Sequence, residues 1–373
     1  MAGVAYARFY MLPKYYEGAD TWRFYRLSLQ ETKWLLKNPL EFVKDLFVYG
    51  YKTPGNLLAP ENSYWNDLKS NVPVKLMAVM NVFTNNSYYA NIILFNFLFL
   101  FGLVALFKVF YELFPQKKVF IIIGLYLLPS TLFWCSGLHK DGLILSAAGM
   151  VIFSFYKGLT AKFQLRHLLC IILCGIVIFS LRNYVLFAFV PALLAWGLSS
   201  KYPGKSKIIF GTVYLIGTVL FFLLPYYFPA INFPLYLSLK QQDFLTLTGG
   251  SAVQLPHLIP TFNGFVAFLP SALDMAFLRP HFSEAKNFSY IPAAIEVVAF
   301  FLLIVTTAFS TKKQKISSPF FLFLLFFSFS ILLICGYTVP FSGAIVRYRS
   351  LVFPLLFTPL LCMGSYKFTK ING

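Results

Sequence analysis

The sequence predicts an all-α protein, a polytopic transmembrane helical bundle of about nine or ten spans. Two observations support this prediction. Hydrophobic residues make up 58% of the 373-residue chain and aromatic residues 20%, whereas only 12% are charged, and the mean hydropathy is +0.71. No soluble domain of this length could bury so much apolar surface. The apolar residues also fall into runs of about the length that crosses a bilayer.

Nine apolar runs divide the chain into its expected spans. Two of them, 166–180 and 183–199, are short and could form one broken hairpin. A further stretch, 258–278, contains Pro, Gly, Asn and Asp, which favours a re-entrant or interfacial helix over a clean span. The nine expected spans are 91–113, 119–136, 142–157, 166–180, 183–199, 207–228, 290–310, 318–337 and 350–366.

The short connections between these spans alternate in charge. One set holds thirteen Lys and Arg and no acidic residue: 115–118, 157–166, 199–207, 311–315 and 366–370. The alternate set, 137–142, the turn at 182–183 and 340–350, holds four. By the positive-inside rule the first set and the C-terminus lie in the cytoplasm, and the second set lies outside.

Four parts of the chain follow from this topology. Residues 1–88 form an N-terminal outer segment with interfacial helices, and 89–228 hold the first group of transmembrane helices. Residues 229–289 form an outer loop with the re-entrant or interfacial helix, and 290–373 hold the C-terminal spans. The stretch 1–13 is too short to span and contains Arg8, so we expect the first transmembrane helix to be missing or truncated. The alternative is that the outer segment translocates unaided.

The first outer segment shows apolar residues at helical spacing, which predicts amphipathic helices at the membrane surface. Turns are expected at KTPGN and APEN. Such helices could line a groove for a lipid-linked substrate or serve only as membrane anchors. One stripe contains Trp34, Leu35, Phe42, Val43, Leu46 and Phe47, and a second begins with Val74, Leu76, Met77, Val79 and Met80.

The order of these segments resembles the GT-C superfamily, the polytopic glycosyltransferases that use lipid-phosphate sugar donors, with a protein-mannosyltransferase-like architecture. The stretch EGADTWRFY is similar to the family's acidic residue and nearby Tyr at the start of the outer loop. PVKLMAVMNVFTNNSYYANIILFNFLFLFGLVALFKVFYELF and LYLLPSTLFWCSGLHKDGLILSAAGMVIFSFYKGL resemble its second and third membrane segments, and SGAIVRYRSLVFPLL its last span with the outer RYR. The chain departs from the family in lacking the first helix and a paired acidic residue.

The resemblance implies sugar transfer, which needs a base for the acceptor hydroxyl and a cationic site for the departing phosphate. Asp20 is the candidate base and Glu17 the second choice, although Asp20 could instead form a solvated ion pair with a nearby Arg. The candidate phosphate site comprises Lys140, Arg182, Arg347 and Arg349. The other candidate substrate-binding residues are His139, Asp141, Arg279, His281 and Tyr348.

Structural alternatives exist for several of these residues. Asp141 lies in the first turn of an expected span, where a negative charge is favoured in any helix. Arg347 and Arg349 could anchor the chain at the interface, and His281 could be a solvated loop residue. No zinc-ligand spacing is visible, and Cys170 and Cys174 have no His or acidic companion, so no metal site is predicted, although a divalent ion could still be needed.

We therefore expect a glycosyltransferase at the extracytoplasmic face of a bacterial inner membrane, or at the lumenal face of an ER membrane. Its expected partners are a lipid-linked sugar donor, a glycan, lipid or protein acceptor, and membrane lipids. Nucleic acid is not expected, because the basic residues that give a net charge of +18 are scattered between spans. The alternatives are a surface-polysaccharide polymerase or ligase acting on polyprenyl-diphosphate-linked glycans, and a transporter or flippase.

Overall fold

The computed structural model describes residues 1–12, 19–48, 63–202, 204–284, 290–310 and 318–364. Every regular element in these ranges is a helix, and the only β-type pairing among them is an isolated bridge between Ala252 and Phe341. The prediction of an all-α fold is confirmed.

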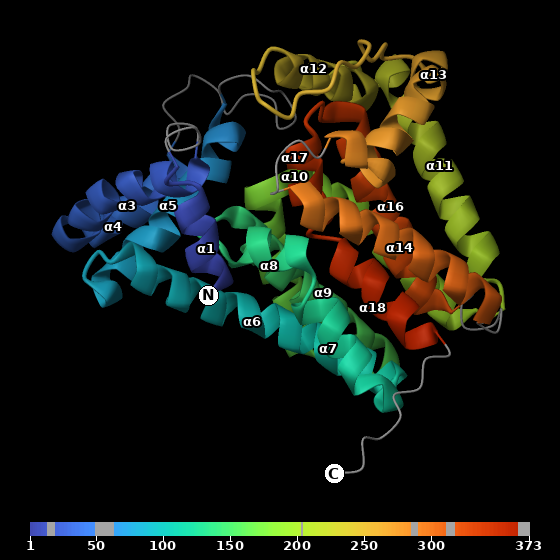
Figure 1. Cartoon of the computed structure of the whole chain (residues 1–373), viewed down its shortest axis with the longest axis horizontal. Helices are drawn as coiled ribbons and strands as arrows, with labels where there is room; N and C mark the ends of the chain where they lie inside the picture. Colours follow the sequence, from blue (N-terminus) through green and yellow to red (C-terminus); the bar gives the residue numbers. More distant parts are fainter. Residues whose placement is uncertain (13–18, 49–62, 203, 285–289, 311–317, 365–373) are drawn as a thin grey trace.

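The elements fall into long apolar helices, bent pairs of short helices, and surface helices at one end of the bundle (Figure 1). In chain order they are α1 (Ala2–Phe9), α3 (Asp20–Lys37), α4 (Pro39–Lys44), η1 (Asp45–Phe47), α5 (Tyr64–Thr84), α6 (Tyr88–Leu113), η2 (Pro115–Lys117), α7 (Lys118–Tyr126), α8 (Pro129–Ser136), α9 (Lys140–Ala161), α10 (Leu165–Lys201), α11 (Ser206–Tyr227), α12 (Phe233–Leu245), α13 (Phe262–Leu273), η3 (Asp274–Leu278), η4 (Phe282–Glu284), α14 (Ile291–Ser310), α16 (Pro319–Thr338), α17 (Ser342–Arg349) and α18 (Phe353–Met363).

By length and composition, six described helices can cross a membrane: α6, α9, α10, α11, α14 and α16. Two bent pairs raise the number to eight if each forms one span. These pairs are α7 with α8, bent by 54°, and α17 with α18, bent by 60°. Proline explains both breaks, because Pro129 is the first residue of α8 and Pro354 the second residue of α18, and neither supplies a backbone N–H to continue the preceding helix. These long apolar helices are compatible with an integral membrane protein.

Helix α10 reverses direction at Arg182, whose backbone leaves the helical region. A Cβ placed on Gly175 would lie 4.0 Å from Leu186 Cδ1, although eleven residues of straight helix would separate the two by about 16 Å. Arg182 contacts Asp141 at the start of α9, and the Trp196 ring contacts Phe155 near its end. The two halves of α10 are therefore the two arms of a hairpin and match the expected stretches 166–180 and 183–199.

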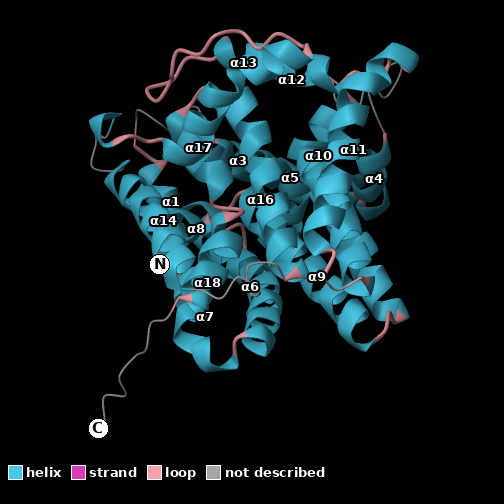
Figure 2. Cartoon of the chain, turned by 90° about the vertical axis from the view of Figure 1, so that its right-hand side faces the viewer, coloured by secondary structure: helices cyan, strands magenta, loops and turns pink. Residues whose placement is uncertain are grey.

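The bundle has two chemically different ends. At the first, which we call the basic end, the ring of Phe320 in α16 contacts Phe110, Tyr156 and Trp196, near the ends of α6, α9 and α10. The lysine-rich connections after these three helices lie there. The opposite end, which we call the site end, holds the α8–α9 connection, the α10 turn and α17, with α12 and α13 beyond them (Figures 1 and 2). Which end faces the cytoplasm stays a prediction.

Helices α6 and α9 cross at unusually close range, and this crossing positions the start of α9. A Cβ on Gly102 would overlap the backbone of Ser146, and a Cβ on Gly149 would overlap the Gly102 carbonyl. Ser146 Oγ accepts a hydrogen bond from Gly102 N at 3.2 Å and donates one to Leu98 O at 3.1 Å. Small residues and interhelical hydrogen bonds of this kind hold helices together where lipid removes the hydrophobic driving force.

The first outer segment forms two packed helices, α3 and α5, beside the bundle (Figure 1). Lys75 is 3% exposed and joins them, because its Nζ lies 2.9 Å from Glu31 and 3.0 Å from Asp45. Its ammonium also lies over the rings of Trp34 and Phe42, which belong to the predicted apolar stripe. The predicted turns KTPGN and APEN lie outside the described residues. The position of these helices in a membrane interface stays a prediction.

The semi-apolar stretch 258–278 folds as α13 followed by the π-helical turn η3. The loop before it is tied to the segment that leads into α17. Val253 N donates to Pro340 O at 2.8 Å, and Ser342 N donates to Ser251 O at 3.0 Å. These two backbone bonds connect the large loop at the site end to the helix that carries Arg347.

We expect Gly102→Leu to lower the stability of the protein by about 2 kcal/mol or more, because a side chain there has no space between α6 and α9. The measurement is the midpoint of thermal unfolding in detergent. Gly217→Leu on α11 is the matched control, since nothing lies within 4 Å of its Cβ position. Equal midpoints for the two variants would show that the crossing is not tight.

Candidate functional site

Asp141 is the centre of a buried charged cluster at the site end. Its carboxylate is fully buried and lies 2.5 Å from Arg182 NH2, 2.7 Å from Arg347 Nε and 2.8 Å from His139 Nδ1. The contact with Arg182 is a charge contact without hydrogen-bond alignment, whereas Arg347 Nε donates a hydrogen bond. Three separate parts of the chain, at residues 139–141, 182 and 347, thus converge on one carboxylate.

Local backbone breaks place each of these side chains. His139 precedes the first residue of α9 in an extended conformation, so it and Asp141 lie in the first turn, where the helix dipole favours a negative charge. Arg182 occupies the reversal of α10. Arg347 belongs to the short helix α17, the first half of a bent pair. Irregular backbone at the ends of apolar helices is where membrane proteins place polar groups.

Asp20 is the exposed acidic member of the cluster. Its Oδ2 lies 3.1 Å from His139 Nε2 and 3.6 Å from Arg347 NH1, and 41% of its side chain is exposed. The side chains of Asp141, His139 and Arg182 are 0%, 1% and 5% exposed, whereas that of Arg347 is 19% exposed. The cluster therefore opens to solvent through Asp20 and Arg347.

Aromatic side chains surround the two arginines. The Arg182 guanidinium lies 4.3 Å from the centre of the Tyr348 ring and donates to Tyr184 Oη at 2.9 Å. The Arg347 guanidinium lies 5.8 Å from the Trp134 ring. Stacking on aromatic faces restricts the planar guanidinium while leaving its edge donors available.

Lys140 adds a third basic side chain. It is partly exposed and within electrostatic range of Asp20, Asp141, Arg182 and Arg347. The cluster around Asp141 therefore holds two carboxylates, Asp20 and Asp141, and three basic side chains, Lys140, Arg182 and Arg347, apart from any charge on His139. The surplus is positive, as expected of a site that receives an anion.

The pKa of the Asp20 carboxyl is lowered from its usual value. Partial burial by itself raises this pKa, but the hydrogen bond from His139 and the positive charges of His139, Arg347 and Lys140 outweigh it. Asp20 is consequently a carboxylate throughout the ordinary pH range. Its stabilising interactions are present above the unfolded-state pKa of about 3.9 and are lost as the pH falls through the lower folded-state value.

Arg349 does not join the cluster, contrary to the phosphate site expected from the sequence. It is 1% exposed, interacts electrostatically with Glu296 of α14, and lies 5.2 Å from the Phe353 ring. The physical reason is helical geometry, because residues two apart on a helix point in nearly opposite directions. The sequence places Arg347 and Arg349 side by side in an outer connection, whereas α17 turns their side chains apart.

Arg279 and His281 form a second network with Asp274 and Glu284. Arg279 Nε lies 2.7 Å from Asp274 Oδ2, His281 Nε2 lies 2.9 Å from Asp274 Oδ1, and Arg279 NH1 pairs with Glu284. No contact found among the described residues links this network to Asp141. Glu17, the second candidate base, lies outside the described residues.

Some residues beside the cluster were not anticipated from the sequence. Tyr6 of α1 packs on Gly137 and lies within electrostatic range of Arg347 and Asp141. The sequence predicts only the remnant of a span at 1–13, and no local pattern there points to Tyr6. Trp134 and Tyr184 could have been found, since both lie within five residues of His139 or Arg182.

No group of three or more His, Cys, Asp or Glu in the described part of the chain could hold a metal ion. Cys170 and Cys174 lie 4.0 Å apart on successive turns of α10, with Sγ of Cys170 also 4.0 Å from Met150 O. They pack within the bundle.

Comparison of the chain with protein-family models, with curated proteins and with solved structures finds no match. Function must therefore be inferred from the chemistry of the site itself. Fixed guanidinium groups beside an exposed carboxylate, at the end of an apolar bundle, can hold an anionic group and accept a proton next to it.

We expect Asp141→Asn to destabilise the protein by about 3–5 kcal/mol, because it leaves the buried Arg182 guanidinium without its carboxylate and leaves Arg347 with Asp20 alone. Thermal unfolding in detergent measures the effect. Glu112→Gln is the control, since its partner Lys157 is 31% exposed and the pair lies at the surface. A midpoint for Asp141→Asn equal to that of the control would contradict the central role of Asp141.

Proposed function

We propose that this protein is a membrane glycosyltransferase of GT-C type. It transfers a sugar from a polyprenyl-phosphate donor to an acceptor at the membrane face opposite its basic connections. The proposed location is the extracytoplasmic face of a bacterial inner membrane, and the charge pattern supports its extracytoplasmic side. The observation that carries the proposal is the position of the Asp20 carboxylate 3.6 Å from the Arg347 guanidinium, at the open side of the cluster.

In this proposal, Arg347 and Lys140 bind the phosphate of the donor. Arg347 presents edge donors that suit two phosphate oxygens, and Lys140 contributes a point charge. Arg182 acts from behind, because it is buried against Asp141 and raises the positive potential without reaching solvent. Asp141 is a positioning residue that fixes both arginines.

Asp20 is the proposed general base. It takes the proton of the acceptor hydroxyl while that oxygen forms a bond to the anomeric carbon of the sugar. The bond between the anomeric carbon and the phosphate oxygen breaks, and the electron pair leaves with the polyprenyl phosphate. Its added negative charge is stabilised by Arg347 and Lys140, and the proton remains on Asp20 until it is released to solvent.

The low pKa of Asp20 makes its carboxylate a weak base in the free protein. Donor binding raises this pKa. His139 lowers the Asp20 pKa most, and the Arg347 charge lowers it further; a donor phosphate on Arg347 offsets this second contribution. The pKa then rises toward that of an ordinary carboxyl group, which strengthens the base only when the donor is bound. The ion pairs of the free site also hold Arg347 in position for the donor.

The polymerase or ligase alternative predicts that the arginines converge with His281 and that no carboxylate is essential. In the described contacts His281 pairs with Asp274, while the arginines converge with Asp20, Asp141 and His139. This arrangement favours the glycosyltransferase.

We expect Asp20→Asn to reduce sugar transfer about 10²–10⁴-fold and to leave donor binding intact, because it removes the base but no cation. Arg347→Ala should instead weaken donor binding. The assay adds purified protein to each polyprenyl-phosphate sugar in turn and follows transfer or donor hydrolysis, with binding measured separately.

Asp243→Asn is the control for this assay, since Asp243 is an exposed carboxylate of the same end, paired only loosely with Lys240 at 3.5 Å. If Asp20→Asn transfers sugar as fast as Asp243→Asn, the base assignment is wrong. If Arg347→Ala binds donor like the unmodified protein, the phosphate site is wrong.

The pH dependence of the reaction should show the coupling between donor binding and the Asp20 pKa. The acid limb of kcat/KM, which titrates the free protein, should lie below pH 4, because the Asp20 pKa is lowered there. The acid limb of kcat, which titrates the donor complex, should lie at higher pH because the phosphate offsets the Arg347 charge. Coincident limbs would contradict this coupling.

A further inference from the structure

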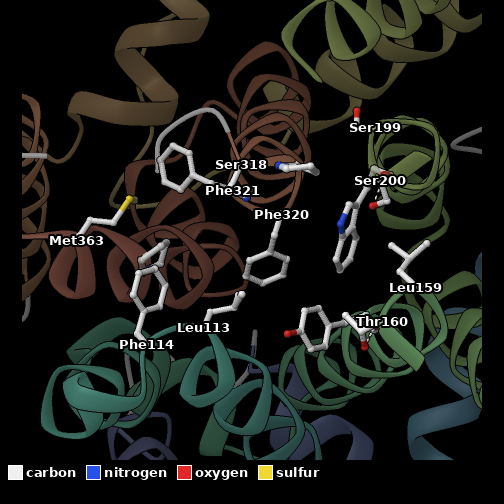
Figure 3. Close-up of a pocket in the computed structure, with 14 residues that line it drawn as sticks. Leu113, Phe114, Leu159, Thr160, Ser199, Ser200, Ser318, Phe320, Phe321 and Met363 are labelled. Atoms are coloured by element: carbon white, nitrogen blue, oxygen red, sulfur yellow. Dashed lines mark hydrogen bonds between the residues drawn. The ribbon is translucent and has the colours of Figure 1, made fainter. Parts of the chain in front are cut away.

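A cavity of about 510 Å³ lies at the basic end, between the ends of α6, α9 and α10, the start of α16, and α18 (Figure 3). Its volume falls within the range of about 300–1,000 Å³ typical of small-molecule sites. The rings of Tyr156, Trp196 and Phe320 form its apolar wall. Tyr156 lies fifteen residues beyond Asp141 on α9, or about 22 Å along a straight helix, so the cavity is separate from the candidate functional site.

The cavity is amphipathic. Its lining is mostly apolar, but Thr160 and Ser200 lie at its exposed edge and Ser318 lines it as well. Ser199, also in the lining, is fully buried, and its Oγ has no hydrogen-bond partner in the described structure. An apolar interior with hydroxyl groups at the opening suits a molecule that has an apolar chain and a polar head.

Three lysines lie next to lining residues of the cavity in sequence or at the end of α18. Lys157 and Lys201 adjoin the lining residues Tyr156 and Ser200 in sequence, and Lys117 reaches the end of α18, where its Nζ donates to Gly364 O at 3.1 Å. Lys201 is exposed, and Lys157 is partly exposed and pairs with Glu112. An anionic head beside this opening would meet an excess of cations.

We propose that this cavity binds one acyl chain of an anionic phospholipid, with the lipid phosphate held between Lys157 and Lys201. The chain lies against Tyr156, Trp196 and Phe320, and hydroxyl groups of the rim contact the glycerol region. This inference goes beyond the proposed function, since it concerns the opposite end of the bundle and no step of sugar transfer. A lipid bound here would contact α9, α10 and α16 together at the basic end.

The experiment measures lipid retention by native mass spectrometry of the purified protein. Phosphatidylglycerol and phosphatidylcholine with identical chains are added separately. We expect at least fivefold more retained phosphatidylglycerol, and a rise in the thermal midpoint with that lipid only. Glycerol phosphate alone should neither bind nor compete, because the chain supplies most of the contact.

Two variants separate the chain site from the head site. Leu159→Trp fills the cavity and should abolish lipid retention. Ile216→Trp should not, because Ile216 lies on α11 away from the cavity lining and is 53% exposed. The double change Lys157→Gln and Lys201→Gln should remove the preference for the anionic lipid. If Leu159→Trp lowers the midpoint without lipid, Ser200→Trp at the rim replaces it.

Several results would overturn the proposal. Equal retention of the two lipids excludes the anionic head site, and undiminished retention by the cavity-filling variant excludes the cavity. Competition by glycerol phosphate alone would show a simple anion site among the lysines. None of these results bears on sugar transfer, so this inference and the proposed function can fail independently.

Discussion

The buried carboxylate of Asp141 determines the arrangement of the site end. Burying an unpaired carboxylate or an unpaired guanidinium inside an apolar bundle costs several kcal/mol, about as much as the pair gains, and the two groups are therefore stable there only as an ion pair. The Asp141 carboxylate contacts Arg182 and Arg347, and it also contacts the His139 ring nitrogen Nδ1. Three chain segments separated by up to 206 residues are thereby fixed around one group. The position of Asp20 relative to Arg347 follows from this arrangement.

The helices that meet at Asp141 are each interrupted close to it. Helix α9 begins there, α10 reverses direction there, and α17 ends there before the chain bends into α18. Interrupted helices expose backbone and polar side chains at a depth where continuous helices present only apolar surface. The close crossing of α6 and α9 at Gly102 and Ser146 then holds the start of α9 in register. Packing in the apolar part of the bundle thus controls the geometry of the charged part.

The two ends of the bundle carry different chemistry. At the site end Arg182 and Arg347 are paired with Asp141 and lie over aromatic rings, which gives them defined positions. At the basic end the lysines are mostly exposed, as expected of residues that set topology and contact lipid headgroups. Arginine dominates the ordered site and lysine the exposed connections, in line with the different hydration and geometry of the two side chains.

The sequence by itself determined the all-α class and the alternation of charged connections, because these depend on composition and local periodicity. It predicted nine or ten spans, whereas the described residues hold six helices that can cross a membrane, or eight if each bent pair is one span. It also singled out Asp20, His139, Lys140, Asp141, Arg182 and Arg347, since charged residues are rare beside apolar spans. Only the tertiary structure decided which of them meet. It separated Arg349 from Arg347 because α17 is a helix, and it paired His281 with Asp274. It brought Tyr6 to the cluster through long-range packing, which leaves no mark on the local sequence.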